Sequence, residues 1–405
     1  MTEVKQISIK DYHYDLPFER IAKYPLSERD LSKLLVYKNQ SIIESKYNSI
    51  QDFLPSDSLL FFNNTKVIPA RLFFKTSLGK NIEVFCLEPI SKNADVYSCM
   101  LQKESAQWKC MVGGAAKWKE QFVYLHVSNL ILKAEIKERE QGTFILDFTW
   151  QPSELSFAEV LQIAGAIPIP PYLKRETESI DLERYQTIYA DKEGSVAAPT
   201  AGLHFTDNVF LKLKTKGIEP TYLTLHVGAG TFKPVKSETL ADHEMHGEYI
   251  DVSLTTLEFL YQNIDKLVTA VGTTSMRTLE SLFWIGQKIA QQPSIKPNEL
   301  LVDQWQPYSA SNKQMSAKES LKYIIEFLYQ HQLKSLYAKT SIIIAPGYEF
   351  KIVNALVTNF HQPESTLILL IAAFIGEDWR KVYQYALEHD FRFLSYGDGS
   401  VLFRV

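Results

Sequence analysis

The segment LILKAEIKER, residues 130–139, alternates apolar and polar side chains over much of its length. Successive side chains of a β-strand point to opposite faces, so a period of two predicts a strand with one buried face and one face in water. Such strands are typical of a small antiparallel sheet or barrel. The alternation sets Leu130, Leu132, Ala134 and Ile136 against Ile131, Lys133, Glu135 and Lys137.

Short runs of the same period lie on both sides of this segment. They are NIEVFCLE (81–88), DVYSCMLQ (95–102), QFVYLHV (121–127) and TFILDFTW (143–150). EQGT (140–143) supplies a hairpin turn between two of the runs. Residues 81–150 therefore predict a compact all-β unit of about five or six strands.

After residue 150 the pattern changes to strands that alternate with helices, which predicts an α/β domain. Ser156 and Glu159 form a capping-box pattern at a helix start, and a helix from Thr206 to Lys216 ends at Gly217. We expect strands at 221–227, 267–272, 340–345 and 354–360, and helices at 276–291, 317–331 and 378–388.

The predicted fold class is α/β, a mixed α/β main domain with an inserted small antiparallel β-barrel domain. The mixed strand and turn signals of the first 60 residues end in DSLLFFNNT (57–65), which favours placing them in the α/β domain. We therefore expect residues 1–75 and 151–405 to form the main domain and residues 76–150 to form the insertion. A chain of 405 residues with 45% hydrophobic side chains has enough apolar material for two cores.

Several features limit the class of protein. The opening residues MTEVKQISIK resemble neither a signal nor a transit peptide, so we expect the protein to stay in the cytoplasm. The apolar run LILLIAAFIG (367–376) is too short for a membrane span and predicts buried core. The three cysteines, Cys86, Cys99 and Cys110, suit neither a disulfide framework nor a zinc site. A net charge of -4 means that an RNA partner would be held by a local basic patch or by shape.

Three loops at predicted strand ends are candidate ligand sites, because open α/β folds bind ligands there. The first, VAAPTAGLHFT (196–206), contains His204, which is either a general acid or base or a helix-entry hydrogen-bonding group. TLHVGAGTFKPV (224–235) contains a glycine pair that serves either close ligand approach or a tight turn. Arg277 in GTTSMRTLES (272–281) suits a carboxylate or phosphate, or else forms a salt bridge with Glu280 or a neighbour.

Two further segments carry polar groups. DHEMHGEY (242–249) places two histidines and a glutamate together, but its spacing is not HExxH, and protonation or RNA contact is favoured over a metal site. Around the last predicted strands lie Tyr348, Asn359, His361, Tyr396 and Asp398. Tyrosines at such positions stack on bases or belong to the core.

Together these segments resemble the S-adenosylmethionine:tRNA ribosyltransferase-isomerases of queuosine biosynthesis. The resemblance runs in order through nearly the whole chain, which makes chance similarity improbable. Besides the loops quoted above, it includes YDLPFERIAKYP (14–25), LLFFNNTKVIPARL (59–72), PIPPYLKR (168–175) and ERYQTIYA (183–190). It implies an α/β domain with an inserted β-barrel.

The resemblance also implies a reaction. S-adenosylmethionine gives its ribosyl group to 7-aminomethyl-7-deazaguanine at the wobble position of a tRNA, and epoxyqueuosine, adenine and methionine result. The sulfonium acidifies the ribose 5′ carbon, so that a base removes a proton, adenine leaves and the aminomethyl nitrogen attacks. Methionine departs as the epoxide closes. The protein must supply proton transfer, a site for adenine and exclusion of water, with no metal and no cofactor beyond the consumed S-adenosylmethionine.

We expect the residues of this site to take three roles. His204 and His226 are the candidates for proton transfer. Gly228, Gly230, Thr273, Thr274 and Arg277 are expected to bind the donor, with Arg277 on its methionine carboxylate. The expected substrate-binding residues are His243, His246, Glu248, Tyr348, Asn359, His361 and Asp398, and the expected phosphate contacts are Arg71, Lys174 and Arg175. The expected partners are S-adenosylmethionine and the tRNA, with no membrane, and the protein is expected to be a monomer.

The sequence departs from the family pattern at three residues and at its ending, where SYGDGSVLF (395–403) replaces the usual SYGDAM. Asn64 and Lys66 stand where the family usually has Asp and Arg, and Gln362 stands in place of Leu. The chain also has extra length at about 290–340. Two alternatives follow: an enzyme that acts on another nucleoside or small acceptor, and a tRNA-binding or regulatory paralogue without catalysis.

Overall fold

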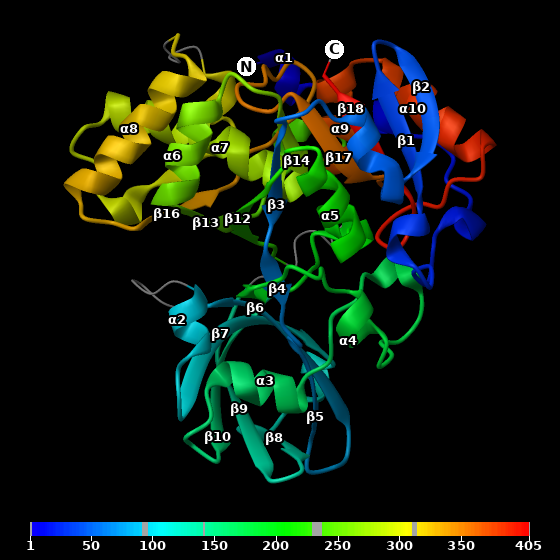
Figure 1. Cartoon of the computed structure of the whole chain (residues 1–405). Helices are drawn as coiled ribbons and strands as arrows, with labels where there is room; N and C mark the ends of the chain where they lie inside the picture. Colours follow the sequence, from blue (N-terminus) through cyan, green and yellow to red (C-terminus); the bar gives the residue numbers. More distant parts are fainter. Residues whose placement is uncertain (1, 91–95, 141, 229–236, 310–313, 405) are drawn as a thin grey trace.

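The structure is a computed structural model that describes residues 2–90, 96–140, 142–228, 237–309 and 314–404 (Figure 1). It has two parts, a broad layer of sheet and helices and a narrower β-barrel beneath it. The chain passes from the first part to the second through β3 (Leu59–Asn63), β4 (Thr65–Val67) and β5 (Arg71–Lys75). The prediction of a mixed α/β fold with an antiparallel barrel is confirmed.

The large sheet has ten strands in the described residues, in the order β15-β16-β13-β12-β3-β14-β17-β18-β1-β2. Its central strands β12, β3, β14 and β17 are parallel, so their carboxyl ends meet at one edge. Every residue of β3, β14 and β17 is buried, as in a sheet covered on both faces. The strands other than β3 are β1 (Lys33–Lys38), β2 (Ser41–Lys46), β12 (Pro220–His226), β13 (Glu248–Ser253), β14 (Val268–Val271), β15 (Leu301–Val302), β16 (Ser335–Thr340), β17 (Ala355–Asn359) and β18 (Gly399–Phe403).

Helices cover the sheet because each has an apolar stripe that must be buried. The largest core cluster joins α6 (Leu254–Asn263), α7 (Thr273–Gln291) and α8 (Ala317–Gln330) to the sheet, and it also takes in α9 (Thr366–Ile375) and α10 (Asp378–Glu388). A second cluster lies under α5 (Asp207–Thr215) and the 3₁₀ segment η4 (Tyr47–Phe53). Most of the apolar run 367–376 is buried, as predicted, and residues 367–375 belong to α9.

The barrel is a closed ring of six antiparallel strands in the order β10-β7-β6-β5-β8-β9. Its remaining strands are β6 (Asn81–Pro89), β7 (Ser105–Gly113), β8 (Phe122–Val127), β9 (Leu130–Arg139) and β10 (Phe144–Gln151). Phe157 of α3 (Phe157–Ala164) packs into the same core as the inward side chains of β9. β5 lies within the range expected for the main domain, so the barrel strands begin before the expected boundary at residue 76.

Two predicted strands were wrong. In DVYSCMLQ the described residues form α2 (Val96–Met100), in which the buried Val96, Cys99 and Met100 follow the helical spacing of three and four. In TSIIIA (340–345) only Thr340 belongs to a strand, and the three isoleucines that follow are irregular and buried. β7 lies in a segment for which no strand was predicted.

The expected extra length at 290–340 forms part of the main domain. β15 and β16 extend the edge of the sheet, and α8 packs against α6 and α7. Of the helices that the structure describes, none is long and apolar enough to cross a membrane.

A buried carboxylate joins α7 to the chain that leads into β17. Glu280 accepts hydrogen bonds from the backbone N–H groups of Lys351, Ile352 and Val353 at 2.9, 3.0 and 2.9 Å and from the Tyr348 hydroxyl at 2.8 Å. Burial raises the pKa of Glu280, and these donors oppose that rise. These hydrogen bonds set the position of α7 relative to β17. The position matters because both elements carry candidate site residues.

Replacing Glu280 with Ala is expected to lower the free energy of unfolding by at least ~3 kcal/mol, because several buried donors lose their acceptor. The exposed Glu319, in the capping box of α8, is the control, and Glu319→Ala is expected to cost about 1 kcal/mol. Urea unfolding of both variants measures the difference. Equal losses would show that Glu280 is not a structural anchor.

Candidate functional site

A cavity of about 210 Å³ lies at the carboxyl ends of the central parallel strands. Val227 follows β12, Gly272 follows β14, and Asn359 ends β17, and all three line the cavity. This is the position at which open α/β sheets bind ligands. The predicted site residues that line it are His243, His246, Thr273, Thr274, Arg277, Asn359 and His361.

The turn into α7 brings one side of the cavity close to the sheet. Gly272 has φ +92°, a conformation that favours glycine, and its N–H donates to the Val357 carbonyl at 2.8 Å. The first turn of α7 then places Thr273 and Thr274 on the cavity wall. The N-terminal amides of a helix carry partial positive charge, which suits a polar or anionic group of a ligand.

Arg277 is held in the cavity wall by a buried ion pair. Its Nη1 donates to Glu248 Oε2, and its side chain is only 9% exposed. Burial alone would raise the pKa of Glu248, but Arg277, His246 and the Gly228 N–H hold it down to about 2. The carboxylate is therefore ionised at neutral pH and orients the guanidinium.

The other edge of the guanidinium carries two buried donor atoms. Arg277 Nε and Nη2 are buried and have no hydrogen-bond partner within the described part of the chain. A buried donor without a partner costs free energy, so such groups commonly mark a place where a ligand or water binds. Nε–H and Nη2–H point in parallel along one edge and match the two oxygens of a carboxylate.

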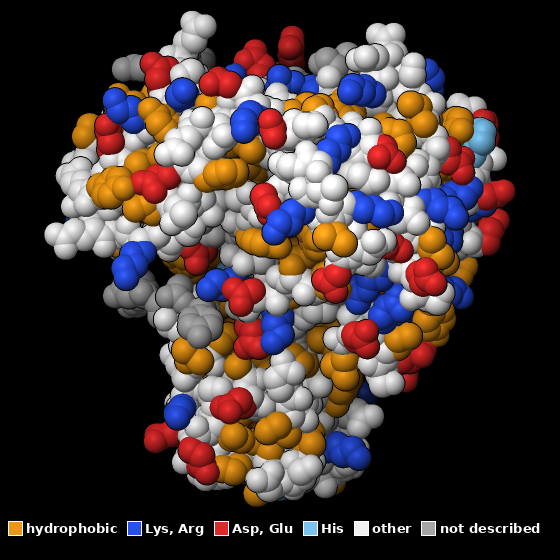
Figure 2. Space-filling view, in the orientation of Figure 1, with side chains coloured by type: hydrophobic (Ala, Val, Ile, Leu, Met, Phe, Trp, Pro, Cys, Tyr) orange, Lys and Arg blue, Asp and Glu red, His pale blue; other side chains and the backbone are white. Residues whose placement is uncertain are grey.

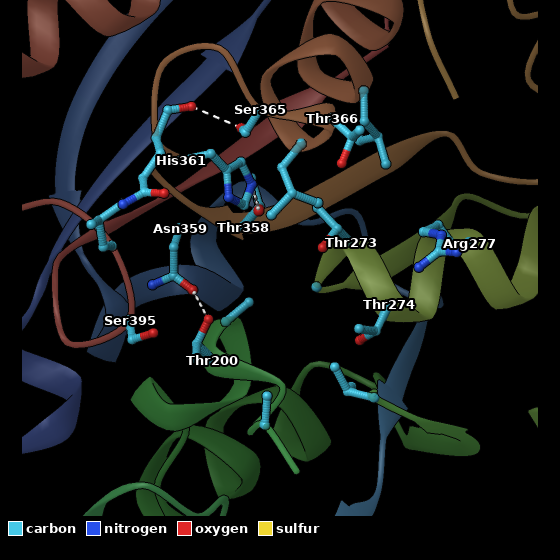
Figure 3. A pocket seen from close by; sticks show the side chains of 18 of the residues that line it. Thr200, Thr273, Thr274, Arg277, Thr358, Asn359, His361, Ser365, Thr366 and Ser395 are labelled. Carbon is cyan, nitrogen blue, oxygen red and sulfur yellow. Dashed lines mark hydrogen bonds between the residues drawn. The ribbon is translucent and has the colours of Figure 1, made fainter. Parts of the chain in front are cut away.

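A hydrogen-bonded group lies on the opposite side of the cavity from Arg277 (Figure 3). Thr200 Oγ1 donates to Asn359 Oδ1 at 2.7 Å, and Asn359 Nδ2 lies 3.3 Å from His204 Nε2. His204 is buried, stacks on Tyr47 with ring centroids 4.2 Å apart, and is not among the residues that line the cavity. Burial lowers the pKa of His204 to about 4, so the ring is neutral at pH 7.

His361 lines the cavity between these two sides (Figure 3). Its Nε2 lies 2.9 Å from Thr358 Oγ1, and its backbone is bound by the hydroxyls of Tyr14 and Tyr383. Burial lowers the pKa of His361 to about 3, so this ring too is neutral at pH 7.

His243 and His246 both line the cavity. Burial, and then the proximity of His246, lowers the pKa of His243. His246 Nε2 lies 3.2 Å from Glu248 Oε1 and thus belongs to the same group as Arg277. The described residues contain no group of three or more His, Cys, Asp or Glu side chains arranged to hold a metal ion.

Other predicted site residues support the walls or lie elsewhere. Glu248 lies beside Arg277, and the Gly228 N–H donates to Glu248 at 3.3 Å. Tyr348 binds Glu280, and Asp398 accepts from the backbone of Lys33 and from Arg392. His226 Nδ1 lies 3.2 Å from Thr65 Oγ1 and is not among the lining residues. Gly230 lies outside the described residues. The proton-transfer roles of His204 and His226 stay predictions.

The structure adds lining residues that the sequence analysis did not single out. Thr200 lies inside a quoted motif and Thr358 inside a predicted strand, but their residue type alone does not separate ligand contacts from structural hydrogen bonds. An apolar part of the wall comes from TSIIIA (340–345), which was wrongly predicted as a strand. The added residues include Thr200, Thr358, Ser365, Thr366, Ser395, Tyr172, Tyr185 and Ile342–Ile344.

The family departures fall in different places. Asn64 accepts from Thr224 Oγ1 at 2.7 Å, and Lys66 pairs with Glu193 at 2.9 Å, and neither lines the cavity. Gln362 does line it. The departure at Gln362 is therefore the one that changes the polarity of the cavity wall.

The predicted phosphate contacts are engaged within the protein. Arg175 forms a bidentate pair with the buried Asp181, both contacts being 2.7 Å. Arg71 pairs with Glu83 at 3.0 Å, and Lys174 lies over the Phe18 ring. Their contact with tRNA stays a prediction.

His204 predicts a pH dependence of stability. Its folded pKa of about 4 lies below the unfolded value of about 6.5, so its contribution is complete above pH 6.5 and is lost as pH falls toward 4. Between pH 7 and pH 4.5 the loss amounts to about 2 to 3 kcal/mol. His204→Gln is expected to reduce the pH dependence of the unfolding free energy by that amount, measured in urea.

The matched control for this measurement is His389→Gln, at the exposed end of α10, which is expected to keep the wild-type dependence. An unchanged dependence in His204→Gln would contradict the buried, neutral state of His204.

Comparison with known proteins identifies the family. Residues 9–402 match the family model described as queuosine biosynthesis protein. The S-adenosylmethionine:tRNA ribosyltransferase-isomerase of Legionella pneumophila (strain Corby) is 37% identical over 398 residues, 97% of this chain and 99% of the relative. The protein of the same name from Vesicomyosocius okutanii subsp. Calyptogena okutanii (strain HA) is 34% identical over 401 residues, 98% of each chain.

A crystal structure of an S-adenosylmethionine tRNA ribosyltransferase from Thermotoga maritima is 28% identical, covers 97% of this chain and 99% of its own, and has a TM-score of 0.46. The two enzymes named above match this chain over nearly their full lengths, so the expected extra length at 290–340 does not distinguish it from them. The matches to the family model and to these two enzymes confirm the resemblance found in the motifs. The chain belongs to the queuosine biosynthesis protein family.

Proposed function

We propose that this protein is an S-adenosylmethionine:tRNA ribosyltransferase-isomerase that acts on 7-aminomethyl-7-deazaguanine at the tRNA wobble position. Its products are epoxyqueuosine in the tRNA, adenine and methionine. The observation that carries the proposal is the unpartnered Nε and Nη2 edge of Arg277 in the cavity. The names of the full-length relatives support the same activity.

The cavity suits a donor that is charged at one end and aromatic at the other. The guanidinium edge of Arg277 is placed to bind the methionine carboxylate. Away from Arg277 the wall includes Tyr172, Leu394 and the Asn359 amide, which suit a purine ring with polar edges. A site with such walls also keeps water from the unsaturated sugar intermediate.

The reaction needs a base for the ribose 5′ proton. A neutral imidazole at the cavity wall can accept a proton. His243 and His361 both line the cavity. The low pKa of His361 makes it a weak base, whereas His243 is only partly buried. We assign the proton to His243 in place of His204 and His226, because neither of those two lines the cavity. In the later steps the aminomethyl nitrogen attacks the sugar, the epoxide closes, and the C–S bond breaks to release methionine.

The tRNA must reach this cavity despite the net charge of -4. Basic and acidic side chains are interspersed over the face seen in Figure 2. We therefore expect recognition by shape and by local contacts rather than by a uniformly basic surface. The cytoplasm, where tRNA modification takes place, is the proposed location.

The activity is tested by incubating the protein with S-adenosylmethionine and a tRNA that carries the 7-aminomethyl-7-deazaguanine wobble base. Mass spectrometry of the nucleosides is expected to show epoxyqueuosine, with an equal amount of released adenine. A tRNA with guanine at the wobble position is the control, because it lacks the aminomethyl nucleophile. Absence of both products from folded protein would contradict the proposal, and label transferred to another acceptor would favour a substrate-shifted enzyme.

Arg277→Lys keeps the charge but removes the planar fork, so it tests the carboxylate contact. We expect the KM for S-adenosylmethionine to rise about 10- to 100-fold, which corresponds to losing one charged hydrogen-bonded contact. Arg380→Lys, on the exposed face of α10, is the matched control and should leave KM unchanged. A normal KM for the Arg277→Lys protein would place the donor carboxylate elsewhere.

A further inference from the structure

The orientation of the Asn359 amide is determined by its neighbours. Its Nδ2 lies 3.5 Å from the Asp398 carbonyl oxygen, which can only accept a hydrogen bond. An amide rotated by half a turn would place Oδ1 against that carbonyl, with two acceptors facing each other. The NH₂ group of Asn359 therefore faces away from Thr200.

His204 imposes the same orientation from a second direction. A hydrogen bond with the backbone of Arg29 raises the pKa of His204, so the ring donates its proton there. The neutral ring has one N–H, and Nε2 is therefore left as an acceptor. Nε2 accepts from Asn359 Nδ2 at 3.3 Å, which again requires the NH₂ group on this side.

Thr200 is constrained in turn. Because Asn359 Oδ1 can only accept, the hydroxyl proton of Thr200 must point at it, at 2.7 Å. What remains for a ligand is one lone pair of Asn359 Oδ1 and the lone pairs of Thr200 Oγ1, both of which are acceptors. Asn359 is 3% exposed and Thr200 is half-buried, and both line the cavity (Figure 3).

We infer that Thr200 and Asn359 form an acceptor-only subsite that takes an exocyclic amino group of a purine-type base, with His204 as the residue that positions Asn359. The inference rests on the proposed function and specifies its ligand recognition. Two ligands of the reaction carry such a group: the adenine of the donor, at position 6, and the 7-deazaguanine of the tRNA, at position 2. A carbonyl or a ring nitrogen without a proton would meet acceptors at this point and be rejected.

The test is a binding measurement by calorimetry with two matched pairs of probes. One pair is S-adenosylmethionine and its analogue with purine in place of adenine. The other is free 7-aminomethyl-7-deazaguanine and its analogue without the 2-amino group. We expect at least ~10-fold weaker binding of the deaminated member in one pair, and that pair identifies which base occupies the subsite.

Two variants separate this inference from a general effect on folding. Thr200→Val and His204→Phe are each expected to reduce the discrimination to less than about threefold, since each removes one element that presents the acceptors. The control is His389→Phe on the surface, which should keep the full discrimination. Thermal unfolding and circular dichroism establish that each variant is folded.

The outcomes distinguish the subsite from the reaction. Epoxyqueuosine formation without discrimination in either pair would overturn the subsite and leave the proposed function intact. Discrimination that Thr200→Val and His204→Phe abolish, in a protein that forms no epoxyqueuosine, would establish the subsite and contradict the reaction. Failure of all four probes to bind, or full discrimination retained in folded His204→Phe, would overturn the inference.

Discussion

The buried pair between Arg277 and Glu248 is the interaction on which the arrangement of the site depends. It joins α7 to β13 and places a permanent positive charge in the wall of the cavity. A buried guanidinium is tolerated only when it is paired, and Glu248 is itself ionised because Arg277 and His246 lower its pKa. The pair occupies one part of the guanidinium and leaves the Nε and Nη2 edge for a ligand.

Further contacts fix the elements that carry the two sides of the cavity. Glu280 attaches α7 to the segment before β17, and Gly272 attaches the start of α7 to β17 itself. On the other side His204 and Asp398 orient Asn359. The cavity wall therefore presents hydrogen-bond donors at Arg277 and the acceptor oxygens of Asn359 and Thr200. A ligand that bridges them needs a carboxylate at one end and an amino group at the other. S-adenosylmethionine has both.

The fold could be predicted where a strand buries one face, because apolar and polar residues then alternate along the sequence. Residues 130–139, which form β9, are the example. The capping box at Ser156 likewise marks a true helix start. DVYSCMLQ was wrong because a short apolar run fits both a strand and one helical turn, and only the packing of Val96 and Met100 decides between them. The strand predicted for TSIIIA was wrong because its isoleucines are buried in core clusters beside the cavity and do not pair with a neighbouring strand.

The site could be predicted in part, because motifs at the carboxyl ends of parallel strands must lie together. Thr273, Arg277 and Asn359 were found in this way. Residue type does not show which face a side chain presents, so the sequence could not show that His204 contacts Asn359 and does not itself line the cavity. Thr200, a common residue in a quoted loop, became recognisable only through its contact with the Asn359 amide.

The most direct measurement is a crystal structure of the protein with S-adenosylmethionine in the absence of tRNA. We expect the two carboxylate oxygens of S-adenosylmethionine to lie within about 3 Å of Arg277 Nε and Nη2, with the pair to Glu248 intact. A donor whose carboxylate is bound elsewhere, with the Arg277 edge still unpartnered, would contradict it.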